Sequence, residues 1–282
     1  AGGRPVGISI PERPDVADAT DLAERVFVLR DVQIDGAGTL GWDIDHRCSL
    51  VPEPPATQWD VECAPTDGVQ VIDLQECRDD SFGANIAGTF PALGSQLVAD
   101  VSLVVSIGSH AHLLRLSGWS GERNDPQVRV DLARIAYGVP DGGTRGDPVL
   151  WDGNDTFYPI DEAFDLSDQP VIRDEDAFVA DGRLVATLPD DSEILLHAGA
   201  RSLLLRLTGA ALTARLAAEG LSEVVLSGRW RVVDLLAELD RVVICASEAL
   251  RTSVEIRIRG AADVRTMPRG GPGMTAPCES IS

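Results

Sequence analysis

Short apolar segments with alternating side chains recur along most of this chain, and they constrain its fold more than any other feature. Alternation of apolar and polar residues is typical of β-strands, because successive side chains of a strand point to opposite faces. The segments of this kind are RVFVLRDVQI (25–34), SLVVSIG (102–108), HLLRLSGW (112–119), QVRVDLARIAYG (127–138), RLVATLPD (183–190), EILLH (193–197), SLLLRLTGAALTARLA (202–217) and EVVLSGRWRV (223–232). Turn-forming residues separate several of them. The sequence therefore predicts a mainly β fold.

One of these segments occurs twice in closely similar form. LLRLSG (113–118) recurs as LLRLTG (204–209), and we interpret the two copies as equivalent strands on facing sheets. We predict a two-sheet antiparallel β-sandwich, of the jelly-roll or lectin-like kind, over residues 25–235. Two domains of similar size are the alternative.

The remaining segments are assigned by composition and spacing. Residues 1–24 are rich in Pro and Asp and are expected to be extended. Long loops are predicted at 41–82 and 138–182, where Pro, Gly and acidic residues dominate. Residues 236–282 are predicted to form a helical segment, with apolar residues three and four positions apart, followed by a Gly/Pro-rich tail.

The charge of the chain excludes several classes of partner. It carries 24 basic residues, all arginine, against 45 acidic residues, for a net charge of −21. Binding to nucleic acid needs clustered cations that displace counterions from phosphates, so nucleic acid is not an expected partner. No uninterrupted apolar run is long enough to span a bilayer. Cations, self-association and carbohydrates remain compatible with this charge.

The five cysteines favour an oxidising compartment. Cys245 and Cys278 are predicted to form a disulfide that tethers the C-terminal tail. One further pair is expected among Cys48, Cys63 and Cys77, with Cys48 and Cys63 as candidates and the pairing left open, so that one thiol remains. These cysteines lead us to expect an exported protein. The first residues show no basic start followed by an apolar block, so its signal peptide is expected to have been removed already.

The chain also resembles a group of uncharacterised exported or lipoprotein-like bacterial proteins. The resemblance rests on GWDIDHRC, on DGVQVIDLQ, and then on FPAL, LLRLSGWSG, WDGNDTF, AFVADGRLVATLP and PCESIS. It covers most of residues 25–282 through loosely matching motifs. The chain departs from the group at Leu74, where the group's pattern has Asn. The resemblance implies export and a shared fold, and it implies no activity.

The stretch GWDIDHRCS (41–49) contains a candidate cation site. Asp43 and Asp45 lie one residue apart, which brings two carboxylates within reach of one hard cation. We predict that they share a Ca²⁺ ion with Asp67 or Asp73, and the nearby stretch ECRDDSFGAN offers further acidic residues. The alternative is a solvated polar turn.

Three histidines form a second candidate metal site. His110 and His112 alternate in SHAHLLRL, so a strand would point both rings to one face, and His197 precedes the repeated strand. Ordinary histidines at strand ends are the alternative.

No nucleophile elbow, zinc-protease, P-loop or dinucleotide motif occurs in the chain. We therefore expect a non-enzymatic exported surface, structural or adhesive protein, and we assign no catalytic residues. The second expectation is a carbohydrate-binding or carbohydrate-active protein, with Trp42, Trp119 and Trp151 as a sugar platform. The third is an enzyme that uses the histidine metal site.

Overall fold

The structure is a computed structural model that describes residues 8–16, 24–33, 41–48, 63, 73, 75–89, 94–138, 148–165, 167–199, 201–217, 220–242, 248–262 and 279–281. Its strands are β1 (Arg25–Leu29), β2 (Ala111–Ser117), β3 (Asp125–Tyr137), β4 (Phe157–Pro159), β5 (Ile172–Ala180), β6 (Arg183–Thr187), β7 (Ser192–Ala198), β8 (Arg201–Ala217), β9 (Gly220–Arg231) and β10 (Ser280–Ile281). Its helices are α1 (Ser95–Ser106), α2 (Val232–Val242) and α3 (Glu248–Gly260), with short turns η1 (Gln75–Cys77), η2 (Phe82–Ala87) and η4 (Asp161–Ala163).

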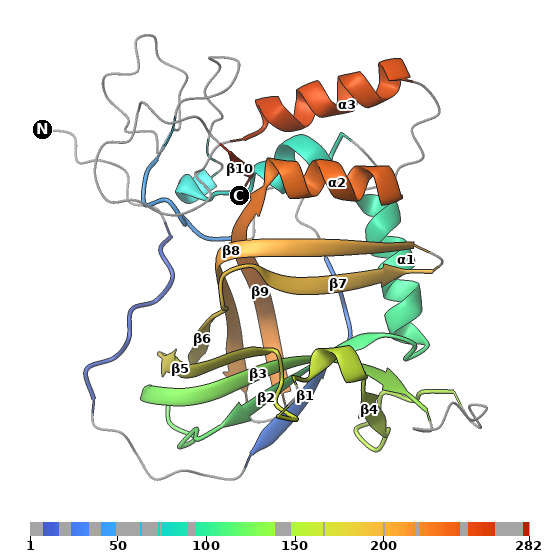
Figure 1. Cartoon of the computed structure of the whole chain (residues 1–282). Helices are drawn as coiled ribbons and strands as arrows, with labels where there is room; N and C mark the ends of the chain where they lie inside the picture. The colour runs from blue at the N-terminus through green and yellow to red at the C-terminus, as the bar shows by residue number, and fades with distance from the viewer. Residues whose placement is uncertain are drawn as a thin grey trace, which may run out of the picture.

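All ten strands belong to one antiparallel sheet. Its order is β1-β2-β3-β5-β6-β8-β9-β10, and β4 pairs with β3 while β7 pairs with β8. The sheet curls into an open half-barrel: β7 and the first part of β8 lie above β1, β2, β3 and β5, and β6 and β9 run between the two levels (Figure 1). The predicted mainly β antiparallel fold is confirmed. The predicted division into two separate sheets is not found.

The long strand β8 explains why there is one sheet. Its residues 201–207 pair with β7, whereas its residues 211–215 pair with β6. Between these parts the register against β9 shifts, and Gly209 there has a φ of 54°. A bulge with glycine in the left-handed region bends a strand sharply. The two similar segments LLRLSG and LLRLTG therefore lie in β2 and β8 of the same curled sheet.

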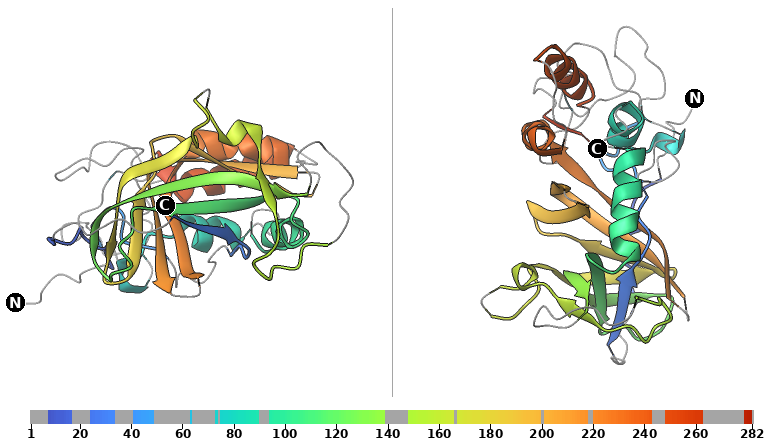
Figure 2. Two further views of the ribbon diagram at one scale, coloured as in Figure 1. Left: turned by 90° about the horizontal axis from the view of Figure 1, so that it is seen from below. Right: turned by 90° about the vertical axis from the view of Figure 1, so that its right-hand side faces the viewer.

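The second half of helix α1 replaces a predicted strand. Residues 102–108 alternate like a strand in the sequence, yet Ser102 to Ser106 are helical. The buried residues Leu97, Val101, Val104 and Val105 follow helical spacing and pack towards the core. Figure 2 shows α1 standing upright beside the curled sheet, where it contacts β7.

The predicted helical C-terminal segment is confirmed by α2 and α3. α2 follows β9 directly and packs on β8, where the backbone N–H of Leu204 donates to Glu238 Oε2 at 3.1 Å. The chain then returns to the sheet, because Ser280 and Ile281 pair with the end of β9. Among the described residues, no helix combines the length and the apolar character that crossing a bilayer requires.

The prediction of a long loop at 138–182 is wrong for the last part of this range. It contains β4, η4 and the nine-residue strand β5. The acidic residues of β5 conceal its strand character, since Ile172, Ala177 and Val179 are buried on the sheet while its charged residues face outward. One of these, Arg173, is fixed by an ion pair across the sheet to Asp131 at 2.8 Å. The first predicted loop, 41–82, contains η1 and the start of η2.

Candidate functional site

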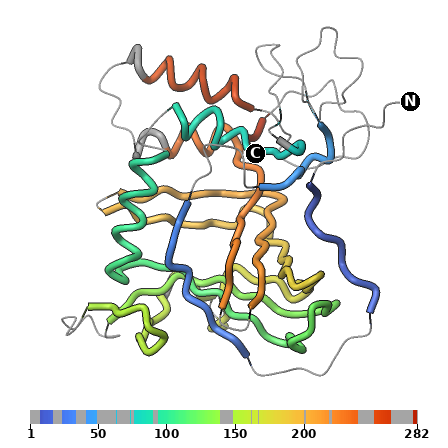
Figure 3. The backbone as a smooth tube through the Cα atoms, turned by 180° about the vertical axis from the view of Figure 1, so that it is seen from behind, coloured from blue at the N-terminus to red at the C-terminus, as the bar shows by residue number. Residues whose placement is uncertain are grey.

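A large cavity lies inside the half-barrel, between its two walls. Its volume is about 1280 Å³, and its lining comes from β1 at one edge of the curled sheet, from β9 and β10 at the other, and from β2, β7, β8 and α1. Seen from behind, residues 24–33 run between α1 and β9 (Figure 3). Pockets for drug-sized ligands usually have ~300–1,000 Å³. This cavity is larger than that range.

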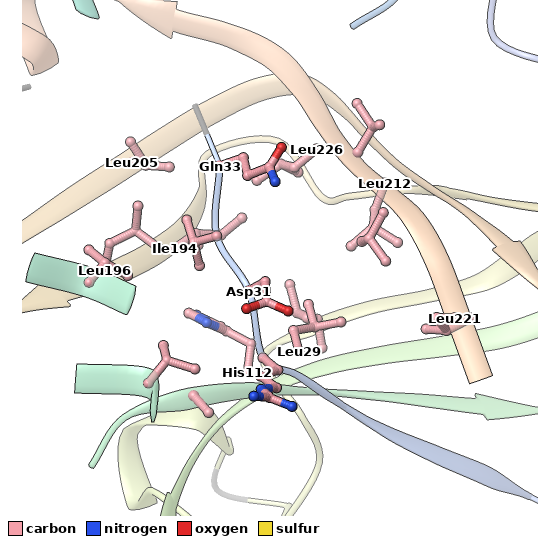
Figure 4. Close-up of a pocket in the computed structure, with 18 of the residues that line it drawn as sticks. Leu29, Asp31, Gln33, His112, Ile194, Leu196, Leu205, Leu212, Leu221 and Leu226 are labelled. Atoms are coloured by element: carbon pink, nitrogen blue, oxygen red, sulfur yellow. The ribbon is translucent and has the colours of Figure 1, made fainter. Parts of the chain in front are cut away.

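The upper wall of the cavity consists of leucine and other apolar residues. Residues directly opposite each other in an antiparallel pair share one face of the sheet. The opposite pairs that line the cavity are Leu203–Leu196, Leu205–Ile194, Leu207–Trp230 and Leu212–Leu226. Figure 4 shows Ile194, Leu196, Leu205, Leu212 and Leu226 of this set arranged around the space.

Several of the apolar side chains in this wall are not fully buried. Leu196, Leu205, Leu221 and Leu226 remain partly exposed although they pack against the core. All four side chains line the cavity. An apolar surface that is held open in this way is typical of a binding site for an apolar ligand.

The lower wall changes from apolar to polar along its strands. Phe27, Leu114 and Leu132 lie opposite one another across β1, β2 and β3, and they form an apolar row on the inner face. Two residues further along, on the same face, the corresponding row is Leu29, His112 and Arg134. Asp31 and His110 continue the inner lining beyond that row, and Figure 4 shows Asp31 and His112 on this side of the space.

The three predicted histidines come together beside this polar row. The rings of His110 and His197 are stacked, with 3.7 Å between their centroids. The Nε2 atoms of His112 and His197 are buried and have no hydrogen-bond partner among the described residues. The described residues contain one group of three or more ligand atoms within 4.8 Å of each other, and it does not include these histidines. The stacked arrangement therefore does not converge on a metal ion.

Two imidazoles of this cluster, those of His112 and His197, have a lowered pKa. The pKa of His112 is lowered to about 4, first by burial and then by the positive charges of Arg134, His197 and His110. The pKa of His197 is also lowered, first by burial and then by Arg134, while Glu162 opposes the shift. Positive potential therefore dominates around His112.

The acidic corner predicted at residues 41–49 brings together three carboxylates. Asp43, Asp45 and Asp79 each place an oxygen within 4.8 Å of the other two, so this group could hold a metal ion. Asp79, which is 7% exposed, accepts hydrogen bonds from the backbone N–H groups of Ile44 at 2.6 Å and Asp45 at 3.0 Å. Burial raises the pKa of Asp43, although the charge of His46 and backbone hydrogen bonds oppose the shift.

The third ligand of this group differs from the predicted ones. Asp73 is not part of the group, and Asp67 lies outside the described residues. Asp79 takes the third position because the backbone N–H of Asp79 pairs with the carbonyl of Trp42, which aligns the two segments. In the sequence, the two adjacent aspartates of ECRDD were the signal that could have identified Asp79 as the third ligand.

A disulfide fixes the same region. Cys48 and Cys77 are bonded, with 4.9 Å between their Cα atoms, which confirms one pair among the three predicted cysteines. Cys63 is fully buried and is also disulfide-bonded, so it is not the thiol left over. The predicted Cys245–Cys278 pair lies outside the described residues.

The predicted sugar platform is not supported by the tryptophans. Trp42 and Trp119 are each 9% exposed, and the Nε1 of Trp119 donates to the carbonyl of Glu122 at 2.9 Å. The Nε1 of Trp151 donates to the carbonyl of Ser106 at 3.0 Å. Flat stacking on a sugar needs an exposed ring face, and burial of Trp42 and Trp119 prevents it.

Comparison of the chain with protein-family models, with curated proteins and with solved structures finds no match.

Proposed function

We propose that this protein is a non-enzymatic binding protein that holds an apolar, chain-like ligand, such as the acyl chain of a lipid, inside its half-barrel. The observation that carries the proposal is the cavity of about 1280 Å³ with its wall of partly exposed leucines. A carbohydrate would instead need many hydrogen-bonding groups in that wall. An adhesive or self-assembling role stays a prediction.

The size of the cavity supports a ligand on energetic grounds. The space of about 1280 Å³ is partly open to solvent, so without a ligand its apolar walls contact water. Each methylene group that displaces water from such walls gains ~0.8 kcal/mol, which favours an alkyl chain.

We further propose that the protein is exported. The Cys48–Cys77 bond and the bonded state of Cys63 support this, because disulfides persist mainly in oxidising compartments. The resemblance to exported bacterial proteins points in the same direction. A carrier of acyl chains in such a compartment would shield its ligand from water.

A second proposal concerns the acidic corner, which we assign to Ca²⁺. Asp43, Asp45 and Asp79 supply oxygen ligands only, as calcium prefers. A bound cation would offset the cost of burying Asp43 in its charged form. Its role would be structural, because the corner is also fixed by the disulfide of Cys48.

The carrier proposal is tested with Nile red, a neutral apolar dye that fluoresces when it leaves water. We expect the dye to bind and to be displaced by hexadecanol. Leu226→Trp fills part of the cavity and should weaken dye binding about ten-fold or more, since it removes space for several methylenes. Leu103→Trp is the matched control, because Leu103 is 63% exposed on α1, and it should bind the dye like the wild type.

Absence of dye binding, or equal binding by both Trp variants, would contradict the proposal. Organic extraction of the freshly purified protein, followed by mass spectrometry, provides an independent readout. It should release alkyl-chain compounds from the wild type and fewer from Leu226→Trp.

A further inference from the structure

We propose that the polar row beside the histidines binds an anionic head group, so that the ligand is an amphiphile with an alkyl chain and a carboxylate. The proposal rests on the proposed function and names the class of ligand for the same cavity. The residues that would contact the head group are His112 and Arg134 of this row and His197 of β7 beside it.

The position of the polar row determines which end of a bound ligand it contacts. Arg134 and His112 lie directly opposite each other on the inner face, and the next row on the same strands is apolar. A rise of ~3.3 Å per residue places the two rows ~7 Å apart. A chain that lies along the leucine wall of β8 and β9 can therefore place its head against β2 and β3. Figure 4 shows His112 on the side of the space away from Leu212 and Leu226.

Two imidazole nitrogens supply the second observation. The Nε2 atoms of His112 and His197 are buried without a hydrogen-bond partner among the described residues, although both side chains line the cavity. A buried polar atom without a partner is uncommon in a native protein. A ligand oxygen that reaches one of these nitrogens would satisfy it, since a neutral imidazole can donate one hydrogen bond from either nitrogen.

The local charge favours an anion over a cation. Arg134 is the charge that most strongly lowers the pKa of both His112 and His197, so the potential at the two rings is positive. The acidic groups nearby are Glu162, which contacts Arg134 at 3.5 Å and is mostly exposed, and Asp31 on the cavity lining. A carboxylate can accept hydrogen bonds from a guanidinium and an imidazole together, which an alcohol or an ester does less well.

The test compares three ligands with the same chain length in displacing Nile red: palmitate, methyl palmitate and hexadecanol, each at concentrations where it is monomeric. We expect palmitate to displace the dye at a concentration about ten-fold or more below that of the two neutral ligands, because a hydrogen bond to a charged group is worth that factor. Equal potency of palmitate and methyl palmitate would overturn the inference.

Two variants test whether this row causes the preference for palmitate. Arg134→Gln and His112→Phe should each remove most of the advantage of palmitate while hexadecanol binding stays within about two-fold of the wild type. Arg123→Gln is the matched control, because Arg123 is 73% exposed and pairs with Asp181 outside the cavity, and it should keep the full preference. Retention of the preference in both row variants would refute the assignment.

The outcomes separate the two proposals. Binding of hexadecanol without a preference for palmitate leaves the carrier function in place and refutes the head-group site. Failure of all three ligands and of the dye to bind refutes the carrier function itself.

Discussion

Acid should destabilise this protein through His112. Its pKa is lowered to about 4 from an ordinary value of 6.5, because the ring is buried against the cavity near Arg134. Between these two values the unfolded chain binds a proton that the folded protein does not bind. The free energy of unfolding therefore falls as the pH decreases through this window. The contribution of neutral His112 is fully present above about pH 6.5 and is lost as the pH approaches about 4.

The size of the effect follows from that interval. The pKa of His112 is about 6.5 in the unfolded chain and about 4 in the folded protein. This difference contributes about 3 kcal/mol to the free energy of unfolding. The ring keeps some exposure to the cavity, so this figure is an upper bound. Other groups also titrate in this range. The effect of His112 is therefore the difference between the wild type and a variant without this group.

The assay is urea unfolding of the wild type and of His112→Phe, followed by tryptophan fluorescence at several values between about pH 7 and about pH 4. The wild type should lose up to about 3 kcal/mol more stability than the variant over this range. Arg123→Gln, which removes an exposed charge, should follow the wild type. Parallel pH profiles for the wild type and His112→Phe would refute the reasoning.

Two further predictions concern the region around the acidic corner. Calcium at about a hundred times its Kd should raise the unfolding free energy by about 2.7 kcal/mol relative to chelator. Asp45→Asn, which keeps the backbone of the corner, should reduce that calcium-dependent difference. A melting temperature that ignores calcium would contradict the site. Peptide mapping without reduction should find Cys48 joined to Cys77; alkylation of either cysteine before reduction would contradict this bond.

The alternation of side chains predicts the strands well where one face of the sheet is clearly apolar. β2, β3, β7, β8 and β9 lie in segments that the sequence identifies. It fails for β5, whose outward face carries Asp and Glu, and for α1, whose valines fit a strand as well as a helix. In α1 the tertiary contacts decide, because Leu97, Val101 and Val105 reach the core together only in a helix.

The acidic corner shows what local sequence can and cannot provide. Asp43 and Asp45 are close in sequence, so their proximity in space follows from short-range geometry. The choice of Asp79 over Asp67 or Asp73 depends on a backbone pairing between two segments far apart in the chain. The three histidines were also named from sequence. Their stacked arrangement, which distinguishes a polar cavity wall from a metal site, depends on how β7 lies against β2.

The sequence pattern does not predict the cavity, because the same leucines would fit equally well in a closed hydrophobic core. Leu203, Leu205 and Leu207 alternate as the inner face of a sandwich strand would. Whether that face meets a second sheet or an open space depends on the bend at Gly209, which turns β8 from the upper wall into the strands that join the two walls. A single bulge in β8 therefore decides whether the inner leucines fill a closed core or line a binding cavity.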